Sequence, residues 1–153
     1  MTSKLSDKKL AVLGAGKLGG ILLRAYLKQG LFRAKNVTAT VKHSEKAAAI
    51  AKELGVAVGS DNRKAVKGAD IILLGVKPQV IAEVLKAIAP EITEKTLIIS
   101  VAASVPTNYL EQHLAAASGG NKEDAFSGDD KTKRVPVIRA MPNTPAAVGC
   151  GMT

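Results

Sequence analysis

The chain has 153 residues, 46% of them hydrophobic, which is enough to bury one core and close to the usual size of a single domain. No stretch approaches the roughly 18 consecutive apolar residues of a membrane helix, and the polar amino-terminal segment does not resemble a signal peptide. One cysteine, Cys150, excludes an internal disulfide, and with only two isolated histidines no metal centre is expected. We therefore expect a single-domain, cytoplasmic chain without a membrane segment or a metal.

The formal net charge of +9 raises the question of a nucleic-acid partner, because lysine and arginine side chains that neutralise phosphates supply most of that affinity. The basic residues are spread over several predicted helices, and only 3% of the residues are aromatic. No stacking platform or recognition motif is present, so we expect no nucleic-acid partner. A solvated basic surface is the favoured interpretation, and attraction of a small phosphorylated cofactor is an alternative that stays open.

A glycine-rich hexapeptide, Gly14-Ala-Gly-Lys-Leu-Gly19, lies between an apolar run at 10–13 and a helical pattern at 21–29. In such a strand-to-helix turn the first glycine allows the tight turn, the second lets a pyrophosphate approach the backbone, and the third packs helix against strand. The following helix N-terminus offers free N–H groups to the anion. The hexapeptide alone is weak evidence, because glycine-rich turns join many kinds of elements.

Strands and helices alternate along the rest of the chain. Apolar or β-branched runs predict strands at 36–41, 56–58, 71–76, 96–101 and 135–139. Helical patterns separate them at 44–54, after Asp61, at 78–89 and at 107–117. Gly30, Gly55 and Pro90 are predicted helix stops, Ser44 an N-cap, and Pro78 a first-turn residue. The alternation predicts a Rossmann-type α/β fold, with a doubly wound, mostly parallel sheet and helices on both faces.

Three further segments complete the predicted organisation. A polar tail at 1–8 precedes a dinucleotide-binding domain at 9–153. Glycines, serines and charges at 118–134 predict a flexible surface insertion. Two prolines predict a fixed loop over 141–149.

The residues that follow the predicted strands are the informative ones, because ligands of open parallel sheets bind beyond the carboxyl ends of the strands. These residues are Gly14–Gly19, Lys42, His43, Ser44, Val76, Lys77, Pro78, Gln79, Ala102, Ala103, Ser104 and Met141–Pro145. The small side chains of Ala102 and Ala103 either leave room for a flat cofactor or allow close helix packing. The sequence does not decide between these two interpretations.

The end of the second predicted strand indicates the cofactor. NAD-selective sites place an acidic residue there, about 20 positions past the glycines, to bind the ribose 2′-hydroxyl. This chain has Lys42 and His43 instead, followed by Ser44, and all three side chains can donate hydrogen bonds to a 2′-phosphate. NADP(H) is therefore favoured over NAD(H). Glu45 would take the acidic role if the strand ran longer than predicted.

Few side chains are candidates for acid–base chemistry. Lys77 could donate a proton or anchor a charge beside the cofactor. The favoured alternative is that Lys77 positions the backbone and its ammonium stays in solvent. Neither His43 nor His113 is a credible general base, and Cys150 has no recognisable base partner.

The segment Val137–Thr153, with its Met141-Pro-Asn-Thr-Pro145 loop, resembles the signature region of pyrroline-5-carboxylate reductases. Other parts of the chain resemble that family in the same order: 14–19, Asn62 in the third crossover, 76–79 and 100–103. The likeness spans about residues 9–153 and is specific because several loops match together. It implies NADPH-dependent reduction of the C=N bond of 1-pyrroline-5-carboxylate to L-proline, the last step of proline biosynthesis.

The resemblance also implies roles for individual residues. The pyrophosphate would be held by Gly14, Ala15, Gly16, Lys17 and Leu18, and the cofactor-binding loop would end with Gly19. The adenosine ribose and its phosphate would be surrounded by Lys42, His43, Ser44 and Asn62. The path to the nicotinamide would be lined by Val76, Lys77, Pro78, Ala102 and Ala103. The nicotinamide and the imine would lie beside Asn143 and Thr144, in the loop with the cofactor-binding residues Met141 and Pro142. The chemistry implied is mainly orientation, since the cofactor carries the hydride.

Two departures from the family pattern qualify this prediction. The insertion at 118–134 is longer than expected, which a surface loop tolerates at little cost. The family's second, helical domain, which forms the dimer and much of the substrate pocket, is absent from this sequence. We therefore expect an amino-terminal cofactor domain of a homo-oligomeric enzyme. Alternatives are a free-standing regulatory module that binds dinucleotides, or a related NADP-dependent reductase of another small imine or carbonyl.

Overall fold

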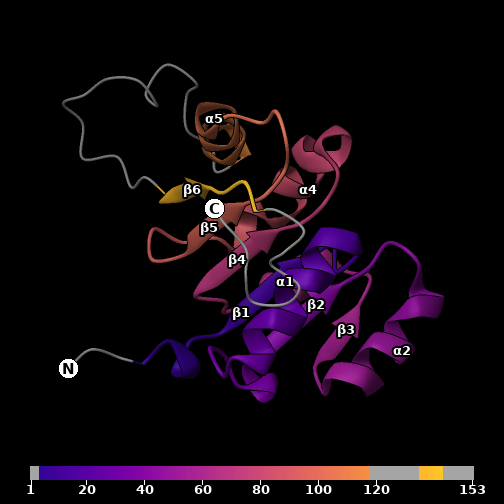
Figure 1. The fold of residues 1–153 in the computed structure, drawn as a ribbon. Coiled ribbons are helices and arrows are strands. Elements are labelled where there is room, and N and C mark those ends of the chain that lie inside the picture. The colour runs from indigo at the N-terminus through magenta and orange to yellow at the C-terminus, as the bar shows by residue number, and fades with distance from the viewer. Residues whose placement is uncertain (1–3, 118–134, 143–153) are drawn as a thin grey trace.

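The order of the strands follows from where the chain crosses over the sheet. The computed structural model describes residues 4–117 and 135–142, and within them six strands pair in the order β3-β2-β1-β4-β5-β6, every pair parallel (Figure 1). The strands are β1 (Leu10–Leu13), β2 (Val37–Thr40), β3 (Ala57–Gly59), β4 (Ile71–Leu74), β5 (Leu97–Ser100) and β6 (Val137–Arg139). From β1 the chain builds outward to β3, then returns to β4 on the other side of β1. This confirms the doubly wound, Rossmann-type fold and puts the ends of β1 and β4 at the reversal, where ligands of such sheets bind.

Helices cover both faces of the sheet (Figure 1). They are α1 (Lys17–Lys28), α2 (Ser44–Leu54), α3 (Asn62–Val66), α4 (Ile81–Ile88) and α5 (Thr107–Ala117), with 3₁₀ turns η1 (Leu5–Asp7), η2 (Ala34–Asn36), η3 (Pro78–Val80) and η4 (Ala89–Glu91). None of the helices in the described ranges has the length and apolar character of a membrane span.

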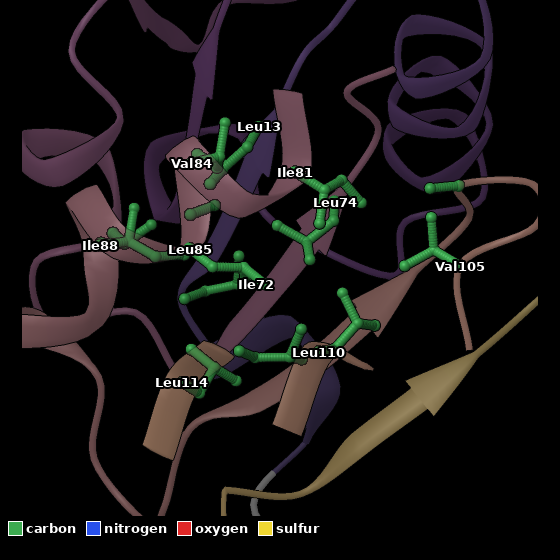
Figure 2. Close-up of a cluster of buried hydrophobic side chains, with 14 of the residues drawn as sticks. Leu13, Ile72, Leu74, Ile81, Val84, Leu85, Ile88, Val105, Leu110 and Leu114 are labelled. Carbon is green, nitrogen blue, oxygen red and sulfur yellow. The ribbon is translucent and has the colours of Figure 1, made fainter. Parts of the chain in front are cut away.

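The central strand β1 supplies both cores because its successive side chains point to opposite faces. Ala11 and Leu13 belong to the core under α3, α4 and α5, part of which Figure 2 shows, with Leu13 beside Val84 of α4. Leu10 and Val12 belong to the core under α1, which α2 flanks. Burial on both faces explains why the sequence of this strand is continuously apolar rather than alternating.

The strands differ from their predicted bounds by one or two residues at their ends, and the larger differences concern the helices. α1 begins at Lys17, four residues before the predicted start, because the last part of the glycine hexapeptide is already helical. His43, in an extended conformation, is the N-cap of α2, so the predicted N-cap Ser44 is wrong by one residue. The single helix predicted at 78–89 is a short α4 between the 3₁₀ turns η3 and η4, which contain Pro78 and Pro90. The predicted insertion at 118–134 lies outside the described residues.

Candidate cofactor-binding site

The three glycines of the hexapeptide have different surroundings. Gly14 has a φ of +82°, and a Cβ there would lie 2.9 Å from both the backbone N and Cγ1 of Val76. A Cβ at Gly19 would overlap the carbonyl oxygen of Gly14. At Gly16, by contrast, a Cβ would meet nothing within 4 Å, and this residue is exposed. The first and third glycines therefore close the turn, and the second leaves the backbone open to an approaching ligand.

A fourth glycine completes this contact, and it was not among the predicted site residues. Gly75 directly follows β4, and its N–H donates to the carbonyl oxygen of Leu13 at 2.8 Å. A Cβ at Gly75 would lie 2.9 Å from the carbonyl oxygen of Gly14 and 3.1 Å from Cα of Gly19. Glycines 14, 19 and 75 therefore meet in backbone contact where β1 and β4 end. The signal for Gly75 in the sequence was a glycine within the otherwise continuously apolar run predicted as a strand at 71–76.

The first turn of α1 presents amides that have no hydrogen-bond partner among the described residues. The first helical hydrogen bond runs from the N–H of Gly20 to the carbonyl oxygen of Gly16, 3.0 Å long, so the amides of residues 17–19 have no partner within the helix. The first turn carries Lys17 and no acidic side chain. Free amides, the helix dipole and a basic side chain together favour an anion at this point.

Thr40, the last residue of β2, links the glycine turn to α3. Its backbone oxygen accepts from the N–H of Ala15 at 2.8 Å, and its hydroxyl oxygen accepts from the N–H of Gly14 at 3.2 Å. The same hydroxyl donates to Oδ1 of Asn62 at 2.7 Å. The structure thus brings the predicted residue Asn62 to the glycine turn. Thr40 was missed because it reads as an ordinary β-branched strand residue.

The three candidates that follow β2, Lys42, His43 and Ser44, are all exposed. β2 ends at Thr40, before these residues, so the strand is not longer than predicted. Glu45 lies in the first turn of α2, and its Oε1 is 3.7 Å from Nδ1 of His43 in an exposed contact. The strand end therefore carries donors rather than a carboxylate.

The segment after β4 gives Val76 and Lys77 different surroundings. Val76 is half-buried and packs against Gly14, since its backbone N and its Cγ1 would each lie 2.9 Å from a Cβ on that glycine. Lys77 is the exposed N-cap of η3, and its carbonyl oxygen accepts from the N–H of Val80 at 3.1 Å. Its neighbour Pro78 is exposed and begins η3. This geometry supports the interpretation of Lys77 as a residue that shapes the backbone.

Five described candidates follow β5 and β6, namely Ala102, Ala103, Ser104, Met141 and Pro142. Ala102 is buried in the core under α5, so helix packing accounts for its small size, whereas Ala103 is exposed. Met141 is 58% exposed and lies 3.5 Å from the Arg139 guanidinium, and Pro142 is half-buried. The structure does not describe the predicted site residues Asn143 and Thr144, nor Cys150.

Other candidate features lie away from this edge. His113 is on α5, where its Nδ1 is 2.8 Å from the carbonyl oxygen of Tyr109 and the two rings are in contact. Within the described ranges, no group of three or more His, Cys, Asp or Glu side chains could hold a metal ion. A cavity of about 210 Å³ lies at the opposite, amino end of the strands, lined by Lys9, Leu10, Lys35, Asn36, Thr38, Ala65, Lys67 and Ala69.

Comparison with known proteins agrees with this geometry. The chain is 31% identical over 144 residues to a pyrroline-5-carboxylate reductase of Methanosarcina acetivorans and 34% identical over 147 residues to one of Pseudomonas aeruginosa, covering 94% and 96% of this chain and 47% of each relative. A solved pyrroline-5-carboxylate reductase from Coxiella burnetii superimposes with a TM-score of 0.75 at 25% identity, covering 94% of this chain and 47% of that one. The chain therefore spans about half the length of these relatives.

A family model covers the elements that build the site. The model described as "NADP oxidoreductase coenzyme F420-dependent" matches residues 9–104, from the start of β1 to the loop after β5. This range contains the glycine turn, Thr40, Asn62 and Gly75. The chain belongs to this family of NADP oxidoreductases.

Proposed function

We propose that this chain binds NADPH at the carboxyl edge of its sheet and forms the cofactor-binding part of a pyrroline-5-carboxylate reductase. The observation that carries the proposal is the open backbone at Gly16, at the N-terminus of α1 and at the reversal of strand order. That arrangement suits the pyrophosphate of a dinucleotide. The similarity to pyrroline-5-carboxylate reductases over nearly the whole chain supports the substrate.

The described residues fit a bound NADPH in two regions. The amides that follow Gly16 bind the pyrophosphate, while Lys42, His43 and Ser44 donate to the 2′-phosphate of the adenosine ribose. Asn62, which is hydrogen-bonded to Thr40 at the end of β2, adds a further donor for the adenosine half. The absence of a carboxylate at the end of β2 supports NADPH over NADH as the cofactor.

The remaining site residues position the nicotinamide and the imine relative to each other. When bound, the nicotinamide supplies the hydride that reduces the imine. Val76, Lys77, Pro78 and Ala103 line its path, and we propose that Asn143 and Thr144 position the imine beside it. The protein's contribution is then distance and angle rather than an acid–base pair. The homo-oligomer and the cytoplasmic location expected from the sequence stay predictions.

The test has two steps. Titration of this chain with NADPH and NADH by calorimetry should show binding that favours NADPH and weakens in a Gly16→Ala variant. Oxidation of NADPH by 1-pyrroline-5-carboxylate is then followed with this chain joined to the part of the Pseudomonas aeruginosa relative that it does not match. A joined protein that folds, binds NADPH and leaves the imine untouched would point to the regulatory module or to another small imine or carbonyl.

A further inference from the structure

Thr40 makes three hydrogen bonds to the site although it faces no open surface. It is 3% exposed, at the end of β2, and paired in register with Leu13 of β1 and Gly59 of β3. Two of its hydrogen bonds hold successive amides of the glycine turn, at Gly14 and Ala15, and the third reaches Asn62 at the start of α3. One buried residue therefore links the turn to α3.

The hydrogen-bond geometry sets the direction in which Asn62 presents its amide. A backbone N–H can only donate, so the Thr40 hydroxyl oxygen is the acceptor for Gly14. Its single proton points to Oδ1 of Asn62, 2.7 Å away. The carbonyl end of the Asn62 amide therefore faces the protein interior. The NH₂ end has no hydrogen bond within residues 4–117 and 135–142.

Asn62 is not needed to cap its own helix. The preceding residue, Asp61, is the N-cap of α3, and its side chain accepts from the N–H of Lys64 at 3.1 Å. The amide of Asn62 is half-buried and directed at Thr40 instead. A pair of donors left over beside the glycine turn suits an oxygen-rich ligand, such as a ribose hydroxyl or a phosphate.

We propose that Thr40 is a positioning residue for the cofactor: it fixes the amide of Asn62 so that its NH₂ donates to the adenosine ribose or its 2′-phosphate. This inference rests on the proposed function, since it names how the adenosine half of the same cofactor is recognised. Thr40 itself does not touch the ligand. Its bond to Gly14 ties the adenosine contact to the turn that holds the pyrophosphate.

The chain offers a matched control on the same strand. Thr38 lies two residues before Thr40, so its side chain projects from the same face of β2. It lines the cavity at the amino end of the strands, and its hydroxyl has no hydrogen bond within the described part of the chain. Replacing either threonine by valine makes the same chemical change, but only Thr40→Val removes the link to Asn62.

The experiment measures dissociation constants for NADPH and for adenosine 2′,5′-bisphosphate, a probe that lacks the nicotinamide half. Thr40→Val should weaken both by about tenfold, the usual scale for one lost hydrogen-bond link. Thr40→Ser should restore affinity to within about threefold of the parent chain, and Thr38→Val should leave it within about twofold. In an Asn62→Ala background, Thr40→Val should weaken binding much less, because the effects of substitutions at two residues that act together are not additive.

A further variant keeps the proposal testable if Thr40→Val does not fold. Asn62→Asp keeps an acceptor for the Thr40 hydroxyl and replaces the NH₂ by an oxygen, so it should fold and lose at least about tenfold in affinity for both ligands. The inference is overturned if Asn62→Asp binds both ligands as tightly as the parent chain. It is also overturned if Thr40→Val weakens binding by the same factor in the parent chain and in the Asn62→Ala background. A parent chain that does not bind NADPH overturns the proposed function instead.

Discussion

The backbones of Gly14 and Gly19 are in contact across the turn between β1 and α1, so closely that a methyl group on Gly19 would overlap the carbonyl oxygen of Gly14. Backbone atoms cannot move aside as a flexible side chain can. Gly16, between them, has free space around it. The same short loop therefore contains one glycine that the fold requires and one that the fold does not.

This contrast predicts opposite phenotypes for two alanine variants. Gly19→Ala should lower the free energy of unfolding by about 1–3 kcal/mol, the usual cost of overpacking. Gly16→Ala should keep its stability and lose at least about tenfold in NADPH affinity, because its methyl group would occupy the space that we propose for the pyrophosphate. Urea denaturation and calorimetric titration check the two effects. The assignment fails if Gly19→Ala is as stable as the parent chain.

Gly75 should behave like Gly19 although it lies outside the hexapeptide. An added Cβ would be 2.9 Å from the carbonyl oxygen of Gly14, so Gly75→Ala should also cost about 1–3 kcal/mol of stability. Gly59, at the end of β3, is the control, since a Cβ there would meet nothing within 4 Å. Thermal unfolding of both variants should show a lowered midpoint for Gly75→Ala alone.

Cofactor selectivity should depend on Lys42 and His43. Replacing both by alanine should weaken NADPH binding more than NADH binding, because only NADPH carries the 2′-phosphate to which we propose that they donate. Lys67→Ala removes one positive charge at the opposite end of the sheet and should leave the ratio of the two affinities unchanged. Titrations with both cofactors measure this ratio. An equal loss for NADPH and NADH in the double variant would contradict the assignment.

Ser104, in the loop after β5, has a φ of +62°, a left-handed conformation in which glycine is the relaxed residue. Ser104→Gly should therefore raise the free energy of unfolding by up to about 1 kcal/mol. Ala103→Gly, one residue earlier, relieves no such strain and should lower it by about 0.5–1 kcal/mol. Urea denaturation should show shifts of opposite sign, and a loss of stability in both variants would show that the strain at Ser104 is negligible.

The ion pair between Arg24 of α1 and Glu53 of α2 should contribute to stability above the ordinary pKa of glutamate and not in strong acid. The side-chain hydrogen bond from Arg24 at 2.8 Å lowers the pKa of Glu53 below its ordinary value. A carboxyl group whose pKa is lower in the folded than in the unfolded chain contributes stability above its ordinary pKa and loses it as pH falls through the lowered one.

The contribution of this pair should be small, because both side chains are about half exposed. Glu53→Gln should unfold at a slightly lower urea concentration than the parent chain at neutral pH and at the same concentration in acid. Added salt should shrink the difference at neutral pH. A difference that grows as the pH falls would contradict the direction of the pKa change.

Much of the fold was predictable because local patterns agree with it. The continuous apolar runs of β1 and β4 indicated strands buried on both faces, and Gly30 and Gly55 have the positive φ values expected of helix C-termini. The start of α1 was not predictable, because Gly19 and Gly20 have poor helix propensity and a helical pattern is recognisable only from Ile21 onward.

The candidate site likewise contains some residues that the sequence predicted and others that it did not. The glycine hexapeptide could be placed from its spacing together with its position between an apolar run and a helical pattern. The roles of Thr40 and Gly75 could not, because both arise from contacts between β1, β2 and β4 that only the assembled sheet creates. Asn143 and Thr144 lie outside the described residues, and their part in the site stays a prediction.

The contact between the glycine turn and the end of β4 also affects the stage of synthesis at which the chain could first bind NADPH. Because Gly75 and Val76 hold Gly14 in place, a nascent chain that has emerged only as far as α1 contains the hexapeptide but not the finished cradle. We therefore expect NADPH to bind the folded chain and not the unfolded one. The melting temperature should then rise as the NADPH concentration is increased, as mass action requires.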